Sequence, residues 1–478
     1  RRQFISASAA TASLRSVQGA AARAGAGKLF AGAATANITP ALGCAIAGNM
    51  TYTPASEIHD ELHVRSLVLD NGKARVAFAI VDSCMVPGDI IRRARQLIQR
   101  HTGIPPQNVL VAATHTHSAP AATHLFQSQP DPAYVEWLVI RISDCVRRAV
   151  NHLEPARLGW GVGREERFVF TRRFYLKPGT MPPDPFGRTT DRVKMNPGRD
   201  NPNIVKPEGP ADPDVGVLAV ESVDGRPICV LGNYALHYVG GTGPGHVSAD
   251  YFGCWADSMA RLAGLAGSRN YPPFVAMLTN GCSGSSTATY APGAQGNLPP
   301  YGRMQHIADT VAAEAFRTWR TARFEDWVEL GAAEEQVELS VRLPSADEVR
   351  EARRILAAEP ASGQVKGLDK IYARETVFLA EYPPKVKTPI QALRIGSLGI
   401  ATFPGEAFAE LGLEVKAKSP FRPTIAIELG NDYHGYIPTV LAHENGGYET
   451  WRAKSSYLEK HAAPKMVAAA LRQLEALA

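Results

Sequence analysis

Residues 108–118, Asn-Val-Leu-Val-Ala-Ala-Thr-His-Thr-His-Ser, place two histidines directly after a short apolar run. The apolar run, residues 108–113, is typical of a buried strand. Because side chains alternate along a strand, His115 and His117 are expected to leave the same face of the sheet. Proteins of the α/β class place their sites where strands end, so the two imidazoles suit metal binding or proton transfer.

The chain on both sides of this segment alternates short β-rich runs with helical stretches, which predicts an α/β fold with a mixed β-sheet core flanked by helices. Residues 64–69 and 74–81 flank Asp70-Asn71-Gly72, a strong hairpin signal. Further strands are expected at residues 217–221, 228–236, 274–279, 391–395 and 400–403. Helices are expected at residues 90–100, 134–153, 304–321, 346–358, 406–417 and 455–477.

One long segment lacks any periodic pattern. Residues 175–215 contain nine of the 35 prolines of the chain. A loop of this length within a compact protein is usually functional. We interpret it either as a surface excursion or domain linker, or as a lid or wall over a substrate site.

The composition is that of a globular protein with a sizeable core, since 45% of the 478 residues are hydrophobic and 20% are charged. No run of about 18 apolar residues occurs, so no membrane-spanning helix is expected. Residues 1–28 hold five of the 51 basic side chains and none of the 46 acidic ones, which leaves the rest of the chain balanced in charge. That balance argues against a nucleic-acid partner. The six cysteines show no C-x-x-C spacing, so a structural zinc knuckle is not expected.

The first 28 residues have the pattern of a twin-arginine export signal. Arg1-Arg2-Gln3-Phe4-Ile5 precedes a mildly apolar Ser/Ala stretch and small residues suited to cleavage. The signal predicts an exported protein, periplasmic or secreted, with residues 29–478 as its folded domain. The alternative is a disordered Ala-rich extension, and an intact amino terminus in a native host would contradict the signal.

Two more candidate ligands follow apolar strands. His237 comes directly after the strand expected at residues 228–236, and Glu406 follows Thr402-Phe403-Pro404-Gly405. Two neutral imidazoles and one carboxylate are a common ligand set of catalytic zinc. Taken singly, His237 is also explained as a core histidine and Glu406 as a favourable charge in the first turn of a helix.

A cluster of small and hydroxyl residues, Asn280-Gly281-Cys282-Ser283-Gly284-Ser285-Ser286-Thr287, follows the strand expected at residues 274–279. Small residues allow a ligand to approach the backbone closely, and N–H groups there suit an oxyanion. The cluster offers several candidate nucleophiles. Its alternative interpretation is a Ser-rich surface turn.

With these landmarks in order, the sequence resembles the amino-terminal catalytic domain of the neutral ceramidase family. The matching stretches are Ala36 to Pro40, Ile58-His59-Asp60 with Arg65, Thr114 to Ser118, Asn233 to His237, the cluster at 280–287, Phe403 to Glu406, and Asn431-Asp432-Tyr433 with Tyr436. The resemblance implies an α/β catalytic domain over residues 29–478, without the carboxy-terminal immunoglobulin-like domain of full-length ceramidases.

The resemblance also implies site residues. It implies a Zn²⁺ ion bound by His115, His237, Glu406 and Tyr436. It places His117, Arg172 and Tyr448 around the scissile carbonyl, with Arg172 chosen over Arg173 because Thr171-Arg172 stands where the family has Asn-Arg. Zinc would polarise the amide carbonyl, and His117 with Tyr448 would hold the developing oxyanion.

The nucleophile region departs from the family. Ceramidases carry serine three residues after a glycine in a G-D-x-S-P-N context, whereas Gly284 here is followed by Ser285, Ser286 and Thr287. Thr287 holds the nucleophile position by spacing, and Ser285, Ser286 or metal-bound water remain alternatives. The run that follows Tyr448 also lacks the small-residue and tyrosine stretch of the family's lipid site.

The function expected from these residues is a zinc-dependent hydrolase of the neutral ceramidase type that cleaves the amide of a ceramide-like or other small-molecule or lipid N-acyl substrate. One alternative is a metal-independent hydrolase in which Cys282 is the nucleophile and His117 or His237 the base. The other is a relative that binds a lipid or sugar without turnover.

Overall fold

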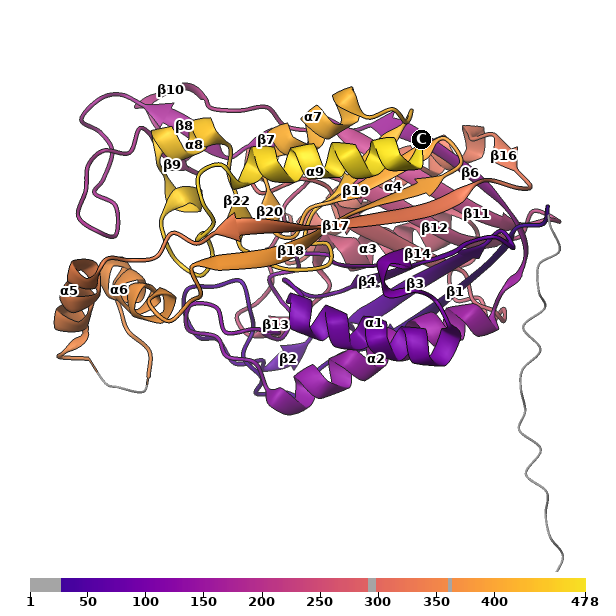
Figure 1. Ribbon diagram of the computed structural model, residues 1–478, viewed down its shortest axis with the longest axis horizontal. Coiled ribbons are helices and arrows are strands. Elements are labelled where there is room, and N and C mark those ends of the chain that lie inside the picture. The colour runs from indigo at the N-terminus through magenta and orange to yellow at the C-terminus, as the bar shows by residue number, and fades with distance from the viewer. Residues whose placement is uncertain (1–26, 291–297, 360–362) are drawn as a thin grey trace, which may run out of the picture.

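The computed structural model describes residues 27–290, 298–359 and 363–478 (Figure 1). The expected export signal therefore lies almost entirely outside the described residues. Within the described ranges no helix combines the length and apolar character needed to cross a membrane. Two β-sheets lie between outer helices, and the expected α/β fold with a mixed sheet core is confirmed.

The larger sheet is mixed and has nine strands in the described part of the chain, in the order β14-β12-β11-β6-β1-β3-β4-β5, with β16 paired to β6. Their bounds are β1 Phe30–Asn37, β3 His63–Asp70, β4 Arg75–Val81, β5 Val109–Ala113, β6 Glu154–Arg164, β11 Asp214–Ser222, β12 Pro227–Tyr234, β14 Val275–Asn280 and β16 Phe324–Glu325. Neighbours are antiparallel except at the two edges, where β4 pairs in parallel with β5 and β12 with β14. β14 also contacts β3, β4 and β5, so the sheet is strongly curved and its two edges approach each other.

The smaller sheet contains β17 Leu330–Ser340, β18 Lys385–Ile395, β19 Leu398–Thr402 and β21 Thr424–Ile427. Its apolar face packs on the larger sheet. One buried cluster joins Leu67 and Leu231 of the larger sheet to Leu393 and Ile425 of the smaller one. A two-sheet core of this kind leaves the outer faces to be covered by helices.

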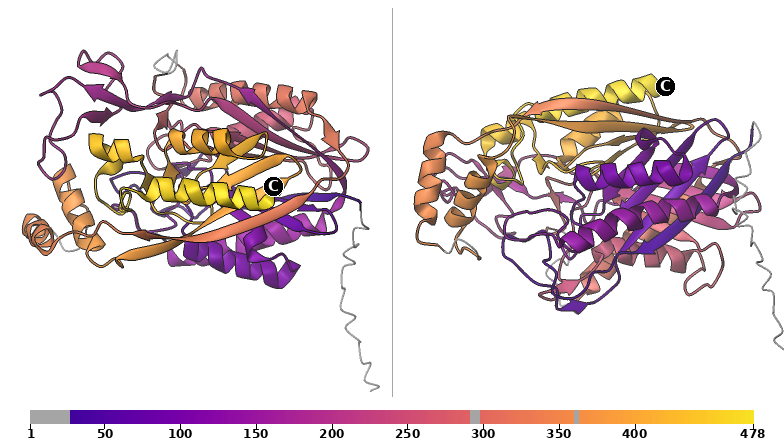
Figure 2. Two further views of the ribbon diagram at one scale, coloured as in Figure 1. Left: turned by 45° about the horizontal axis from the view of Figure 1, so that its top comes forward. Right: turned by 60° about the horizontal axis from the view of Figure 1, so that its bottom comes forward.

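Helices cover both outer faces (Figures 1 and 2). α1 Gly88–Thr102 and α2 Pro132–Asn151 lie along the β1–β3–β4 part of the larger sheet, and α3 Asp250–Leu262 and α4 Gly302–Thr321 cover its β6–β11–β14 part. α7 Ala409–Lys418 and α9 Ala462–Leu477 cover the smaller sheet. α5 Ala346–Leu356 and α6 Leu368–Leu379 pack on each other at one end of the molecule, and α8 Val440–Asn445 lies near that end.

Short strand pairs join loop segments that lie far apart in the sequence. β7 Phe170–Thr171 pairs with β15 Ser286–Thr287, and β20 Glu406–Ala407 pairs with β22 Tyr436–Ile437. A third pair joins β2 Glu57–Ile58 to β13 His246–Val247. These pairings connect loops rather than core strands.

The expected hairpin is confirmed, because β3 and β4 pair with Asp70 opposite Arg75. Three local predictions were wrong. The helix expected from Glu406 begins at Ala409, because the Glu406 N–H donates to the Gly435 carbonyl in a strand pair (2.9 Å). The helix expected from residue 455 begins at Ala462, because Ser456 turns back to pair with Ala453.

The third correction concerns residues 175–215. A small sheet runs through this segment, with β8 Arg173–Leu176 between β9 Val193–Met195 and β10 Ile204–Pro207. Its strands are three or four residues long, and most of their side chains are partly or fully exposed. Such short strands carry no apolar alternation that a sequence pattern would reveal.

Candidate active site

Three side chains from strand ends meet in the interior. His115 Nε2 lies 3.2 Å from His237 Nε2 and 3.4 Å from Glu406 Oε2, and His237 Nε2 lies 3.8 Å from the same oxygen. All three residues are at most 3% exposed. One ligand atom from each lies within 4.8 Å of the other two, which is a spacing that a single metal ion can bridge.

The curvature of the large sheet brings the two histidines together. His115 follows β5 at one edge and His237 follows β12 next to the other edge. Glu406 comes from outside that sheet, on β20, which continues the chain after β19 of the smaller sheet. The site therefore lies where the ends of both sheets meet.

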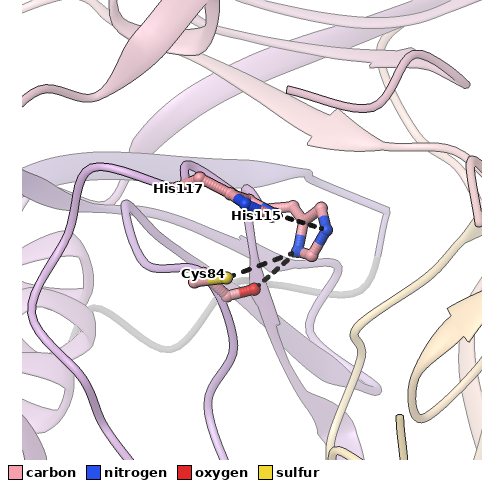
Figure 3. A group of neighbouring side chains, drawn as sticks. All are labelled: Cys84, His115 and His117. Carbon is pink, nitrogen blue, oxygen red and sulfur yellow. Dashed lines mark hydrogen bonds between the residues drawn. The ribbon is translucent and has the colours of Figure 1, made fainter. Parts of the chain in front are cut away.

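His115 does not continue the strand, which ends at Ala113. Its φ is +78°, in the left-handed region that a histidine rarely adopts. The expected alternation of side chains is therefore not the reason the two imidazoles converge. The left-handed backbone at His115 redirects its side chain, so that His115 Nε2 and His117 Nε2 lie 3.2 Å apart (Figure 3).

His115 and His237 are each oriented by a hydrogen bond at Nδ1. His115 Nδ1 donates to the Cys84 carbonyl at 2.8 Å, and His237 Nδ1 donates to the Ser283 carbonyl at 3.2 Å. A carbonyl at Nδ1 holds the proton there and leaves Nε2 as the metal-binding lone pair. Cys84, His115 and His117 form a second group that could hold a metal, with the Cys84 sulfur 3.9 Å from His115 Nδ1. That group would require His115 to give up its carbonyl bond.

Glu406 is held by its backbone and by one tyrosine. Its register partner in the β20–β22 pair is Tyr436, and its Oε1 accepts a hydrogen bond from the Tyr433 hydroxyl at 3.0 Å. Its Oε2 is buried and has no hydrogen-bond partner within the described residues. A buried carboxylate oxygen without a hydrogen bond, facing two imidazoles, is the environment of a metal ligand.

Charges inside this cluster balance one another. Burial would lower the pKa of His115, but the Glu406 carboxylate and the Cys84 thiol raise it well above its ordinary value. Burial would raise the pKa of Glu406, and His115, Tyr436 and Arg172 together hold it below the ordinary value. Burial, Arg172 and His115 lower the pKa of His237 well below the ordinary value. A divalent cation at Nε2 would take over the role that a positive charge on His115 has beside the Glu406 carboxylate.

A second polar pair supports His237. Ser283 Oγ donates to Glu428 Oε1 at 2.5 Å, and the Ser283 carbonyl accepts from the His237 ring. Burial raises the pKa of Glu428 to about 8, and the charge of His115 and the Ser283 hydroxyl only partly offset that effect. Ser283 is thus a positioning residue for His237.

His117 stands between the cluster and a cavity. Its ring stacks on Tyr238, with ring centroids 3.6 Å apart and an interplanar angle of 14°. Gly48 also lies close to this ring, since a Cβ there would approach His117 Cγ to 2.5 Å. Burial lowers the pKa of His117 well below its ordinary value, and His115 and Arg172 lower it further. His117 is therefore neutral at neutral pH.

The cavity has a volume of about 470 Å³. Seven of the residues that line it are polar candidates or aromatic neighbours of the cluster: His117, Arg172, His237, Tyr238, Thr287, Tyr436 and Tyr448. His115 and Glu406 do not line it. A substrate in the cavity would therefore meet the cluster at His237, beside His117.

Arg172 reaches the cavity through the β7–β15 pair. Its backbone N–H donates to the Ser285 carbonyl at 2.8 Å, and its Nε donates to Glu449 Oε1 at 2.8 Å. Its Cζ lies 5.3 Å from the Tyr436 ring centroid. Arg173 points elsewhere, bonding Glu449 and Glu208, and does not line the cavity.

Tyr436 and Tyr448 lie next to each other, with ring centroids 5.7 Å apart. Both line the cavity. Burial is the main reason that the pKa values of both hydroxyls are raised, and the Glu406 carboxylate adds to the effect. Both tyrosines therefore keep their hydroxyl protons as the site stands.

The candidate nucleophiles in the cluster at 280–287 lie in different surroundings. Thr287 lines the cavity, and its Oγ1 shares a 2.8 Å hydrogen bond with Thr289 Oγ1. Ser285 Oγ accepts from the Ala409 N–H at 3.1 Å and does not line the cavity. Ser286 Oγ donates to the Ala235 carbonyl at 2.8 Å. Thr287 is thus the hydroxyl of the three that a substrate can contact.

Cys282 sits in a different environment. It is 1% exposed within an apolar cluster, against Gly412. Burial raises the pKa of its thiol well above the ordinary value. A buried thiol that resists ionisation is a poor nucleophile, so the structure gives the Cys282 alternative no support.

Several contacts were not foreseen from the sequence. The sequence marks Tyr433 only as part of a stretch that resembles the neutral ceramidases, and its bond to Glu406 depends on the fold. Tyr238, which stacks on His117, directly follows His237, and Glu449, which pairs with Arg172, directly follows Tyr448. Adjacency to a candidate residue was the one available signal for both.

No family model matches the chain, and no curated protein sequence matches it significantly. Solved structures, in contrast, match the chain in fold. The crystal structure of neutral ceramidase from Pseudomonas aeruginosa matches with a TM-score of 0.69 and 17% identity, over 94% of this chain and 75% of that one. A structure described as ceramidase complexed with C2 matches with a TM-score of 0.70 and 18% identity over the same shares. The chain therefore has the fold of the ceramidases.

Proposed function

We propose that this chain, which has the ceramidase fold, is a zinc-dependent hydrolase that cleaves the amide bond of an N-acyl substrate. The observation that carries the proposal is the convergence of His115, His237 and Glu406 beside a cavity lined by His117, Arg172 and Tyr448. The likeness to ceramidase structures supports the class of enzyme by analogy of fold.

The donor set fits zinc. Two imidazoles with free Nε2 atoms and one carboxylate oxygen without a hydrogen bond form a common zinc ligand set, and Tyr436, beside Glu406 in the β20–β22 pair, is the proposed fourth ligand. When bound, zinc would supply a Lewis acid for the acyl carbonyl and would acidify a hydroxyl or water at the open position.

The chain's own residues supply the rest of the site. The buried Arg172 Nη2 has no hydrogen-bond partner among the described residues, and Tyr448 retains its hydroxyl proton, so both are donors for negative charge on the carbonyl oxygen. The neutral His117 ring is able to accept a proton from the attacking hydroxyl and to return it to the departing amine. Tyr238 and Gly48 hold that ring in place.

The attacking group is the Thr287 hydroxyl or water. Thr287 is the hydroxyl of its cluster that faces the cavity, whereas Ser285 is bound to the Ala409 backbone. Attack by Thr287 would form an acyl ester at its Oγ1 and release the amine, and water would then release the acid. Attack by water would give both products in one step.

The substrate is proposed to be a small-molecule or lipid amide, ceramide-like or otherwise N-acylated. Export to the periplasm or outside the cell is a separate proposal, which rests on the pattern of residues 1–28 alone.

The proposal is tested by metal analysis and by hydrolysis of N-acyl substrates by wild-type protein, His115→Ala and a matched control. His101→Ala is that control, since His101 is exposed on α1 and outside the cavity. Wild type and His101→Ala should contain about one zinc per chain and turn over the substrate, and His115→Ala should lose both. Equal turnover by all three proteins rejects the proposal.

A further inference from the structure

The wall of the cavity is positively charged. Three basic side chains line it, Arg172, Lys194 and Arg303, and no aspartate or glutamate does. The residues outside the described ranges contain no aspartate or glutamate either, so they cannot supply a missing carboxylate. A cavity with cations and no acidic residue favours an anionic ligand.

One of the three cations is already neutralised. Arg172 pairs with Glu449, which also pairs with Arg173, and Arg173 has a second partner in Glu208. These two arginines and two glutamates balance. The positive charge of the cavity wall therefore comes from Lys194 and Arg303.

The side chain of Lys194 has no ion-pair or hydrogen-bond partner within the described part of the chain. Lys194 is the central residue of β9, between the buried Val193 and the half-buried Met195. Its side chain is partly buried, and all three residues of β9 line the cavity. Lys194 thus lines a ligand space in which no carboxylate offsets its charge.

Arg303 is committed to one hydrogen bond out of the five N–H groups of a guanidinium. Its Nη2 donates to the Ala288 carbonyl at 2.6 Å, next to Thr287, and it forms no ion pair in the described ranges. The Asp250 carboxylate acts on it through space, but the oxygens of Asp250 accept from the backbone N–H groups of Val239, Gly240 and Tyr251. The first turn of α4 holds Arg303 and no acidic residue, which adds to the positive potential.

The same cavity offers apolar surface for a chain. Met50, Met181 and Met195 line it together with Leu368 and Trp451. Methionine side chains adapt to irregular apolar ligands. A volume of about 470 Å³ is within the usual range for small-ligand sites.

We propose that Lys194 and Arg303 form an anion subsite that binds the carboxylate of an N-acyl amino acid, with the acyl chain on the methionine-lined wall. This inference rests on the proposed function, because it names the substrate class of that site. An N-acyl amino acid differs from a ceramide-like substrate, which carries no charge for Lys194 and Arg303 to bind.

The test compares two amides that differ in charge, N-dodecanoylglycine and N-dodecanoylethanolamine, in steady-state hydrolysis by wild type, Lys194→Met, Arg303→Met and Lys206→Met. Lys206 is the matched control, an exposed lysine on β10 of the same small sheet that does not line the cavity. Wild type should favour the glycine amide by tenfold or more in kcat/KM. Lys194→Met and Arg303→Met should each raise its KM about tenfold, as expected for loss of a charge-assisted bond, with less than a twofold effect on the neutral amide. Lys206→Met should match wild type with both.

Preference of wild type for the neutral amide, or equal losses on both amides in the Lys194 variant, would overturn the subsite. N-Dodecanoylphosphoethanolamine replaces the carboxylate by a phosphate, and a stronger preference for it would overturn the assignment to a carboxylate. Lys194→Met is the decisive variant if Arg303→Met does not fold, since the Lys194 side chain forms no hydrogen bond in the described ranges.

Binding separates the two proposals if neither amide is hydrolysed. Trp451 lines the cavity, so its fluorescence reports occupancy. Tighter binding of N-dodecanoylglycine than of the neutral amide, weakened about tenfold in Lys194→Met, supports the subsite even where hydrolysis fails. Equal affinity for the two amides rejects it.

Discussion

Arg172 and Glu449 form a buried ion pair, with Arg172 Nε 2.8 Å from Glu449 Oε1, and both side chains are at most 5% exposed. The same carboxylate accepts from Arg173 Nη1 at 2.5 Å. Glu449 thus pairs with two buried guanidinium groups, and it links the residues at the end of β7 to the segment that carries Tyr448. Removing one partner of such a pair leaves an uncompensated buried charge.

Glu449→Gln should therefore destabilise the protein by about 3–5 kcal/mol and abolish hydrolysis, since Arg172 loses its anchor. Urea unfolding and steady-state kinetics measure the two effects. Glu444→Gln is the matched control, because Glu444 is 54% exposed in its contact with Lys460 and its variant should unfold at the same urea concentration as wild type. Similar stabilities of the two variants would contradict the role of Glu449.

Gly48→Ala should displace His117. Gly48 has a φ of +93°, and a Cβ there would lie 2.5 Å from His117 Cγ. Gly43→Ala is the matched control, since Gly43 has nearly the same φ of +92° with nothing within 4 Å of the added Cβ. Both changes should cost about 1 kcal/mol of backbone strain, but kcat should fall tenfold or more in Gly48→Ala alone. Equal activity of the two variants would place His117 outside the chemistry.

Tyr433→Phe should weaken metal binding while the ligands stay intact. Its hydroxyl donates to Glu406 Oε1 at 3.0 Å, and loss of such a supporting bond lowers metal affinity by about 10–100-fold. Competition with a fluorescent zinc chelator measures the affinity directly. Tyr52→Phe, at a partly exposed tyrosine outside the candidate cluster, should bind zinc as wild type does.

Removal of metal should lower the melting temperature of the wild type. A ligand that binds only the folded state adds about 4 kcal/mol when its concentration is about 1,000 times its Kd. A chelator should therefore lower the Tm of wild type and leave that of His237→Ala unchanged, and added Zn²⁺ should restore the wild type alone. A chelator effect of equal size on both proteins would point to a metal site elsewhere.

His443 should make the fold sensitive to acid. Burial, with contributions from Arg342 and Lys460, lowers its pKa to about 3. The unfolded chain takes up a proton near pH 6.5, whereas the folded chain does not until about pH 3, so stability falls as pH drops between these values. The loss at pH 5 should be about 2 kcal/mol.

His443→Gln should remove that part of the acid sensitivity. Urea unfolding at pH 7 and pH 5 should show a smaller loss in His443→Gln than in wild type, whereas the exposed His101→Gln should keep the loss of the wild type. An identical pH dependence of wild type and His443→Gln would show that this histidine is not buried in its neutral form.

Part of the site could be predicted from single segments. His115, His237 and the residues after β14 follow apolar strands, and a buried strand with polar residues at its end is visible in the sequence. The choice among neighbours was not visible. Arg172 faces the cavity and Arg173 does not, and Thr287 faces it whereas Ser285 does not, because the β7–β15 pair sets which side chains point inward. Strand pairs between distant segments, with only two residues in each strand, leave no periodic pattern in the sequence.

The sequence by itself determined most of the long strands and helices, and that imidazoles and hydroxyl groups follow the buried strands, because apolar periodicity is a local property. The tertiary structure decided that these groups share one site. The curvature of the large sheet brings the ends of β5 and β12 together, and the β20–β22 pair brings Glu406 to them. It also decided the charge of the cavity, because Glu449 neutralises Arg172 while Lys194 and Arg303 remain unpaired in the described part of the chain.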